Sequence, residues 1–229
     1  MTAFVDLNAD LGEEVTDDEA LLELVTSANV ACGYHAGNHE IMRAVCASAV
    51  RRGVSVGAQV SYDDRENFGR VARDVAHDLL REQVADQVGT LSDIAEAEGT
   101  AVRYLKPHGA LYHRVMDDEE QARAVLEGSG SLPVLGMAGA VVLDLARAHG
   151  RGVLLEGFPD RAYGDDGRLV PRDRPGAVLS DSETIAANAV ELARTVDSVC
   201  VHGDSPGAVD HARAVRRALE DAGWELRGL

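Results

Sequence analysis

The feature that most constrains this chain is a regular alternation of short apolar runs with longer amphipathic helical patterns. Strands that alternate with helices form right-handed βαβ units and a mostly parallel sheet. No break in composition divides the 229 residues, so we expect an α/β fold in which a seven-stranded parallel β/α barrel forms a single domain over residues 1–229. The apolar runs predict seven strands and a short final one, at Phe4–Asp6, Asn29–Cys32, Val54–Ala58, Val102–Leu105, Pro133–Gly136, Val153–Glu156, Ser198–Val201 and Trp224–Leu226.

Polar residues and glycines mark several helix ends. Thr16 and Ser180 each stand three residues before a glutamate, the spacing of a capping box, so a helix is predicted to begin at each. Asn38 is expected to cap a helix that ends at Gly53. Segment 157–178 is too long for an ordinary connector and is typical of a functional rim or lid. Further helices are predicted at 74–99, 118–126, 140–149 and 208–222.

The composition excludes several classes of partner. The formal net charge is −17 and the pI is about 4.7, so duplex nucleic acid and anionic membranes would be repelled. The three cysteines have no regular spacing, which predicts neither a disulfide scaffold nor a zinc ribbon. The sequence opens with no charged segment followed by an apolar run and contains no run of about 18 apolar residues, so a cytoplasmic location is expected.

The 22 basic residues include a single lysine, Lys106. Lysine is a compact point charge whose pKa burial can lower, which distinguishes it from arginine. Lys106 directly follows a predicted strand, and the active sites of β/α barrels lie on the loops after the strands. The position therefore indicates a functional lysine; the alternative is chance retention in an arginine-rich sequence.

Other polar residues follow the predicted strands in the same way. Three of the eight histidines, His35, His108 and His202, each follow a strand beside a glycine, which lets the backbone turn sharply or approach a ligand. One such histidine could be a hydrogen-bonding loop residue, but three on one face favour a functional site. Further candidates on the same face are Asn8, Asp10, Glu13, Tyr62, Asp160, Arg161, Arg172 and Asp204. Four histidines within helical patterns are instead predicted to lie on the surface: His39, His77, His149 and His211.

Asp10, His35, His108 and His202 form a set that supports two kinds of chemistry. A carboxylate with histidines can bind a divalent metal ion, and the same groups can act as general acids and bases without one. The sequence contains no Gly-x-x-x-x-Gly-Lys-Ser/Thr motif, which excludes a P-loop, and no nucleophilic-serine elbow. The residues by themselves leave acid–base and metal-assisted chemistry both open.

Seven segments carry a family resemblance and together span almost the whole chain: Val5–Glu13, Val25–Asn38, Asn67–Arg70, Leu105–Tyr112, Asp160–Tyr163, Leu169–Arg172 and Val201–Asp204. They include the motifs Asn-Ala-Asp-Leu-Gly-Glu, Lys-Pro-His-Gly and Val-His-Gly-Asp, and in this order they resemble the LamB/YcsF family of prokaryotic 5-oxoprolinase A subunits. The resemblance implies a barrel like that of glycoside hydrolases and polysaccharide deacetylases. It also implies ATP-dependent opening of 5-oxo-L-proline to L-glutamate, with partner subunits B and C and with Mg²⁺ accompanying the ATP.

Under this resemblance the catalytic candidates take hypothetical roles. The lactam oxygen would be phosphorylated before water attacks the activated carbon. Lys106 would neutralise charge on the phosphate or on a developing oxyanion. Asp10 or His35 would act as the base, and His108 or His202 would donate a proton.

The remaining candidates are assigned to substrate binding. Arg161 and Arg172 would hold the substrate carboxylate through paired hydrogen bonds. The other polar positions would complete the pocket: Asn8, Glu13, Tyr62, Asp160 and Asp204.

One departure from the family pattern is Gln59, where relatives commonly have histidine. Histidine there could ligate a metal or relay protons, whereas glutamine forms only hydrogen bonds, which argues against a metal site. Two alternatives to the oxoprolinase reading stay open. One is a metal-dependent amide hydrolase or deacetylase on the same barrel, and the other is a non-catalytic component that binds substrate or assembles the complex.

Overall fold

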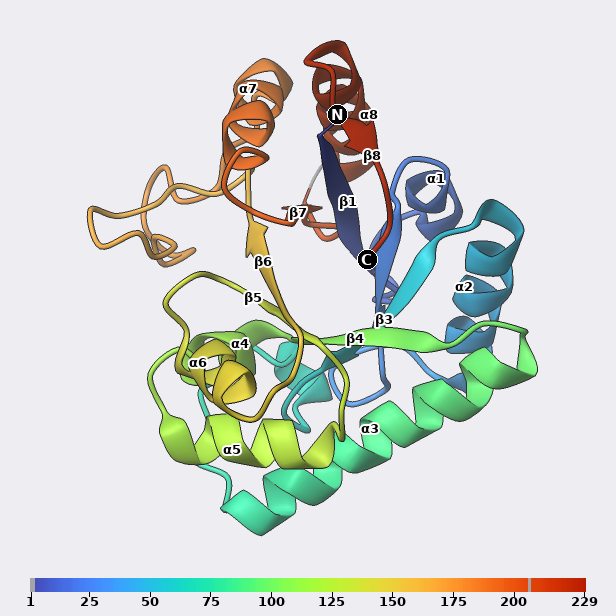
Figure 1. Ribbon diagram of the computed structural model, residues 1–229, viewed down its shortest axis with the longest axis vertical. Helices are drawn as coiled ribbons and strands as arrows, with labels where there is room; N and C mark the ends of the chain where they lie inside the picture. Colours follow the sequence, from blue (N-terminus) through green and yellow to red (C-terminus); the bar gives the residue numbers. More distant parts are fainter. Residues whose placement is uncertain (1–2, 206) are drawn as a thin grey trace.

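The computed structural model describes residues 3–205 and 207–229 and folds them around a closed parallel barrel (Figure 1). The barrel strands are β1 (Phe4–Leu11), β2 (Ser27–Ala31), β3 (Ser55–Val60), β4 (Val102–Pro107), β5 (Val134–Gly136), β6 (Val153–Gly157) and β7 (Ser198–Val201). Strands β2 to β7 pair in sequence order, and β1 pairs with both β7 and β2, which closes the barrel. The prediction of a seven-stranded parallel β/α barrel is confirmed.

Helices cover the outside of the barrel (Figure 1). They are α1 (Asp18–Leu22), α2 (His39–Arg52), α3 (His77–Ala97), α4 (Gly109–Arg114), α5 (Glu119–Gly128), α6 (Val141–Ala148), α7 (Ser182–Leu192) and α8 (Ala208–Asp221), with a 3₁₀ helix at Arg65–Asn67. Helix α3 packs beside α5, and α7 packs beside α8. Strand β8 (Glu225–Leu226) pairs with the first residues of β1. Within residues 3–205 and 207–229, no helix is long and apolar enough to cross a membrane.

The helix caps agree with the sequence in part. Asn38 caps α2 by accepting hydrogen bonds from two backbone amides, and Gly53 ends that helix with a left-handed backbone, as predicted. The predicted cap at Thr16 is wrong: Asp17 caps α1, while the Thr16 hydroxyl donates to the carbonyl of Gly203. The cap predicted at Ser180 is displaced in the same way, because Asp181 accepts from the Thr184 amide and starts α7. In both cases a carboxylate next to the hydroxyl residue takes the capping role.

One of the four histidines predicted to lie on the surface does not. His211 lies on the buried face of α8, is 4% exposed, and its Nε2 is 3.3 Å from the carbonyl oxygen of Ser180. His39 and His149 are exposed and His77 is partly exposed. The error arises because an imidazole can replace an apolar residue on a packed helix face when its nitrogen finds a backbone acceptor.

Strand β1 runs five residues beyond its predicted end, and its inward side chains are polar. Side chains alternate between the two faces of a strand, so Asp6, Asn8 and Asp10 share one face. Asn29 Nδ2 lies 2.7 Å from Asn8 Oδ1 and 2.8 Å from Asp10 Oδ1, which joins β2 to β1 through a buried amide. Residues Asp6 to Leu11 are all buried, so this polar run is part of the barrel interior and not a loop.

A glycine and a tyrosine on neighbouring strands fill the barrel centre together. Gly57 of β3 pairs with Tyr104 of β4, and the Tyr104 ring occupies the place that a side chain on Gly57 would need. The fully buried Tyr104 hydroxyl donates to Asn29 Oδ1 at 2.7 Å. The ring thus joins β4 to β2 across β3 inside the barrel.

Segment 157–178, between β6 and α7, projects beside the barrel (Figure 1). Arg161 anchors it, since its guanidinium donates to the carbonyls of Ala177 at 3.1 Å and Val170 at 2.7 Å. Two antiparallel bridges, one of them between Tyr163 and Leu169, tie the segment to itself. The predicted irregular rim is therefore held by specific backbone contacts.

Candidate active site

A cavity of about 290 Å³ opens where the barrel strands end. Its walls come from the ends of β1 and β4, the start of α4, segment 157–178 and the turn after β7. This is the face on which β/α barrels carry their active sites. Seven of the predicted site residues line the cavity: Asp10, Lys106, His108, Arg161, Arg172, His202 and Asp204.

Lys106 lies at the floor of the cavity and is 2% exposed. Its Nζ is 3.1 Å from Asp10 Oδ1, 3.0 Å from Glu156 Oε2 and 3.1 Å from Cys200 Sγ. The ring centre of Phe158 lies 5.3 Å from the same nitrogen, within range of a cation–π contact. The only lysine in the chain is thus enclosed by two carboxylates, a thiol and an aromatic ring.

Lys106 and Asp10 stabilise each other's charged form. Burial alone would lower the pKa of Lys106, but Asp10 and other acidic neighbours raise it well above its usual value. Burial alone would raise the pKa of Asp10, but the charge of Lys106 holds it well below its usual range. The site therefore keeps a protonated amine and an ionised carboxylate in contact with the cavity at neutral pH.

The pKa of Glu156, the second carboxylate beside Lys106, shifts in the opposite direction to that of Asp10. Burial raises the pKa of Glu156, and the opposing effect of Lys106 does not cancel that rise. The Tyr112 hydroxyl is buried beside Glu156. Burial, with the nearby Glu156, raises the pKa of Tyr112 well above its usual value, so this hydroxyl stays neutral and can donate to the Glu156 carboxylate.

His202 and Asp160 form an oriented acid–base pair at the cavity wall. His202 Nδ1 lies 2.9 Å from Asp160 Oδ2, and the His202 backbone amide donates to the same oxygen at 3.3 Å. Burial would raise the pKa of Asp160, but His202 lowers it, so Asp160 stays ionised and accepts the Nδ1 proton. The Phe158 ring stacks on the imidazole at 5.1 Å. His202 Nε2 is thereby left as the nitrogen that can exchange a proton.

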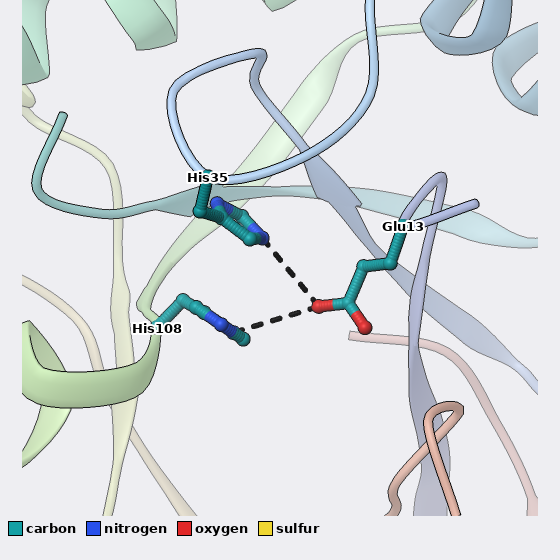
Figure 2. Close-up of side chains that lie close together, drawn as sticks. All are labelled: Glu13, His35 and His108. Carbon is teal, nitrogen blue, oxygen red and sulfur yellow. Dashed lines mark ion pairs between the residues drawn. The ribbon is translucent and has the colours of Figure 1, made fainter. Parts of the chain in front are cut away.

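Glu13, His35 and His108 form a second cluster beside the cavity (Figure 2). Glu13 Oε1 is 3.5 Å from His35 Nε2 and 3.5 Å from His108 Nδ1. The two imidazole rings stack at 4.0 Å, nearly parallel. Gln59 Nε2 lies 2.9 Å from both Glu13 Oε1 and His108 Nδ1. Burial and the adjacent His35 lower the pKa of His108 well below its usual value, so this ring is neutral at neutral pH.

The outer rim of the cavity is cationic. Arg70 and Arg172 both pair with Asp204, the latter at 3.4 Å. Burial lowers the pKa of the nearby His113, and the charges of Arg161 and Arg172 lower it further. A ligand that enters the cavity would therefore pass a group of arginines, which favour anions.

Several residues predicted to bind substrate do not line the cavity. The Tyr62 side chain is fully buried, and its hydroxyl donates to Gln121 of α5 at 2.9 Å, away from the cavity. Asn8 is fully buried beneath Lys106, and Asp160 is fully buried behind His202, so both support cavity residues from below. Glu13 and His35 lie beside the cavity without lining it.

The four residues considered from the sequence as metal ligands do not meet at one point. They are Asp10, His35, His108 and His202. Asp10 is paired with Lys106 and His202 with Asp160, so neither joins His35 and His108. Glu13 takes their place, because the turn after β1 carries it to the two histidines.

Four residues that line the cavity were not among the candidates from the sequence: Arg70, Tyr112, His113 and Phe158. Glu156 and Cys200, which contact Lys106, were not among them either. Arg70 and Tyr112 lie inside segments that carry the family resemblance, so their motif membership was an available signal. Phe158 and Cys200 look like core residues in the sequence, and only their distance from Lys106 and His202 reveals their role.

Comparisons with known proteins find relatives that match nearly the whole chain. A protein of Mycobacterium avium, named as the A subunit of 5-oxoprolinase, is 52% identical over 248 residues, which cover 98% of each chain. One of Streptomyces avermitilis with the same name is 51% identical over 242 residues, which cover 96% of this chain and 97% of that one. A solved lactam utilization protein from Thermus thermophilus superposes with a TM-score of 0.92 at 36% identity, over 99% of this chain and all of that one.

More distant structures share the fold alone. A family 4 carbohydrate esterase from Streptomyces lividans superposes with a TM-score of 0.56 at 12% identity, over 99% of this chain and 92% of that one. The model of the LamB/YcsF family matches residues 5–229. This chain therefore belongs to the LamB/YcsF family.

Proposed function

We propose that this chain is the A subunit of an ATP-dependent 5-oxoprolinase, which opens 5-oxo-L-proline to L-glutamate together with partner subunits B and C. The observation that carries the proposal is the buried, protonated Lys106 at the floor of a cavity whose rim is rich in arginine. The relatives named as A subunits of 5-oxoprolinase support it.

The dimensions and charges of the cavity suit this substrate. Pockets for drug-sized ligands hold roughly 300–1,000 Å³, and this cavity, at about 290 Å³, suits a small acid better than a whole nucleotide. 5-Oxoproline carries one carboxylate and one lactam group. Arg172 at the rim can bind the carboxylate, while the amine of Lys106 faces the lactam oxygen from the floor.

The ATP requirement follows from the chemistry of the bond. An unactivated lactam is a poor electrophile, and transfer of a phosphoryl group from ATP with Mg²⁺ to its oxygen would make the ring carbon reactive. The sequence has no P-loop motif. We therefore assign the need for ATP and Mg²⁺ to the assembled enzyme.

In the proposed reaction, water bonds to the activated ring carbon and its proton passes to a base at the cavity. Lys106 neutralises negative charge on the phosphoryl group that the former lactam oxygen carries. Asp10 holds the Lys106 amine in place and accepts a hydrogen bond from the attacking water. The ring C–N bond then breaks, and His202 Nε2 supplies the proton that the nitrogen needs to leave as an amine, which leaves an acyl phosphate. A second water then bonds to the same carbon and displaces inorganic phosphate, so the products are glutamate and phosphate.

The test uses the assembled enzyme and measures ATP-dependent release of glutamate from 5-oxoproline, with each component omitted in turn. We expect activity only with all three subunits, and loss of glutamate release when Lys106→Met replaces the native chain. Arg123→Gln, which alters an exposed arginine of α5, is the control. Full activity in the absence of this chain, or with Lys106→Met, would overturn the proposal.

The Glu13, His35 and His108 cluster supports a second candidate, a metal-dependent amide hydrolase. That activity needs neither ATP nor partner subunits. It would appear as hydrolysis of an acetylated amide by the isolated chain with added Zn²⁺, and it would persist in Lys106→Met only if the cluster acts without the lysine.

A further inference from the structure

We propose that Glu13, His35 and His108 bind one divalent transition-metal ion, with Gln59 as a fourth donor. One ligand atom from each of the first three lies within 4.8 Å of the other two, and all three side chains are buried (Figure 2). The proposal concerns ion binding and does not depend on the reaction proposed above.

His35 is buried without a hydrogen-bond partner among the described residues. The residue is 1% exposed, and neither ring nitrogen has a hydrogen-bond partner among residues 3–205 and 207–229. A buried polar group without a hydrogen-bond partner is unfavourable, so most such groups in proteins are paired. Nε2 of this ring points to Glu13 Oε1 (Figure 2). An ion between the two atoms would satisfy both.

A backbone carbonyl fixes the tautomer of His108. Its Nε2 lies 3.1 Å from the carbonyl oxygen of Phe68, an acceptor, so Nε2 carries the proton and Nδ1 presents a lone pair. That lone pair faces Glu13 Oε1, another acceptor, at 3.5 Å. Two acceptors that face each other are stabilised by a donor or a cation between them; the Gln59 amide nitrogen takes that place here, and a metal ion can take it when the amide turns. A backbone carbonyl that fixes the far nitrogen of an imidazole is also the usual support of a metal ligand.

The side-chain amide of Gln59 contacts two members of the cluster. Its Nε2 lies 2.9 Å from both Glu13 Oε1 and His108 Nδ1, while its fully buried Oε1 has no partner within the described residues. The amide group can turn by half a rotation, which would exchange the two ends and direct Oε1 at the cluster. Amide oxygens coordinate cations, so Gln59, which from the sequence argued against a metal, can complete the site.

The donor set identifies the class of ion. Two imidazole nitrogens, one carboxylate and one amide oxygen suit first-row divalent ions such as Zn²⁺, Mn²⁺, Fe²⁺ or Co²⁺. Ligand atoms at ~2.0–2.2 Å from a tetrahedral ion lie about 3.3–3.6 Å from one another, so the two 3.5 Å separations already suit an ion of this kind. His108 also lines the cavity, so the ion would lie directly behind the cavity wall.

The test is a titration of the untagged full-length chain, stripped with a chelator, with Zn²⁺ and with Co²⁺. We expect one ion per chain, a rise in Tm on binding, and visible Co²⁺ absorption typical of nitrogen and oxygen ligands. Glu13→Gln and His35→Gln should weaken binding by at least tenfold. His77→Gln is the matched control, because His77 contacts Asp78 and Glu127 on the surface and would bind only adventitious metal.

A wild-type chain that binds no ion, or binding unchanged in Glu13→Gln, would overturn the proposal. If the two cluster variants fail to fold, anomalous scattering from Zn²⁺-soaked crystals of the wild-type chain decides the question. A peak between Glu13 and the two histidines supports the site, and a peak only elsewhere refutes it.

Discussion

Lys106 and Asp10 form an ion pair of 3.1 Å although both side chains are almost completely buried. Removing one member of a buried pair leaves an uncompensated charge, which typically costs about 3–5 kcal/mol. We therefore expect Lys106→Met to lower the free energy of unfolding by about that amount, as measured by urea denaturation. The double variant Lys106→Met with Asp10→Asn should recover a large part of the loss. A change below about 1 kcal/mol in the single variant would show that water or proton uptake compensates Asp10.

Asp160 holds the imidazole of His202 with a 2.9 Å contact to Nδ1. If His202 carries the proton, Asp160→Asn should lower kcat of the assembled enzyme by roughly a hundredfold or more and leave KM nearly unchanged. The pH profile should also change, because the pair sets which nitrogen is protonated. Asp165→Asn, an exposed position in segment 157–178, is the control. An equal effect of the control, or a change in KM alone, would contradict an acid–base role.

Asp6 links stability to pH. Burial raises its pKa from 3.8 to about 6, despite hydrogen bonds from serine and threonine hydroxyls. Between these two pH values the folded chain binds more protons than the unfolded chain, so stability falls as pH rises. From about pH 4 to pH 7 the wild-type chain should lose roughly 2–3 kcal/mol more than Asp6→Asn. Unfolding curves at both pH values check this, and parallel behaviour of the two chains would refute it.

The close contact between Gly57 and the Tyr104 ring leaves no room for a side chain at position 57. A methyl group on Gly57 would collide with the Tyr104 ring, and overpacking of a core costs typically 1–3 kcal/mol, so Gly57→Ala should destabilise the chain by about that amount. The control is Gly89→Ala on α3, where the added carbon meets nothing within 4 Å. Because alanine favours helix over glycine by about 0.5–1 kcal/mol, this control should raise Tm. A neutral Gly57→Ala would mean that the ring can move.

The fold was predictable because each strand and each helix carries its own local pattern. The end of β1 was not, since Asn8 and Asp10 look like loop residues until the barrel supplies their partner Asn29. Short helices such as α4 are equally hard to predict, because one and a half turns contain too few residues to show a period.

The position of the site was predictable from the rule that loops after barrel strands carry function, and Lys106 was found by that rule and by its rarity. Groupings within the site were not predictable. Tyr62 follows a strand as Lys106 does, yet it turns outward to Gln121. The meeting of Glu13 with His35 depends on how far each loop extends above the barrel, which no local pattern encodes.

The rim formed by segment 157–178 is fastened before any ligand arrives, by the guanidinium of Arg161 and by the Tyr163 hydroxyl, which accepts from the Phe158 amide at 2.7 Å. The conformational entropy of ordering this rim is lost when the chain folds, so it need not be subtracted from the free energy of binding. A small acid would therefore enter a mouth of fixed shape, and its association rate would be set by diffusion and by the field of the arginines, with no slow closing step.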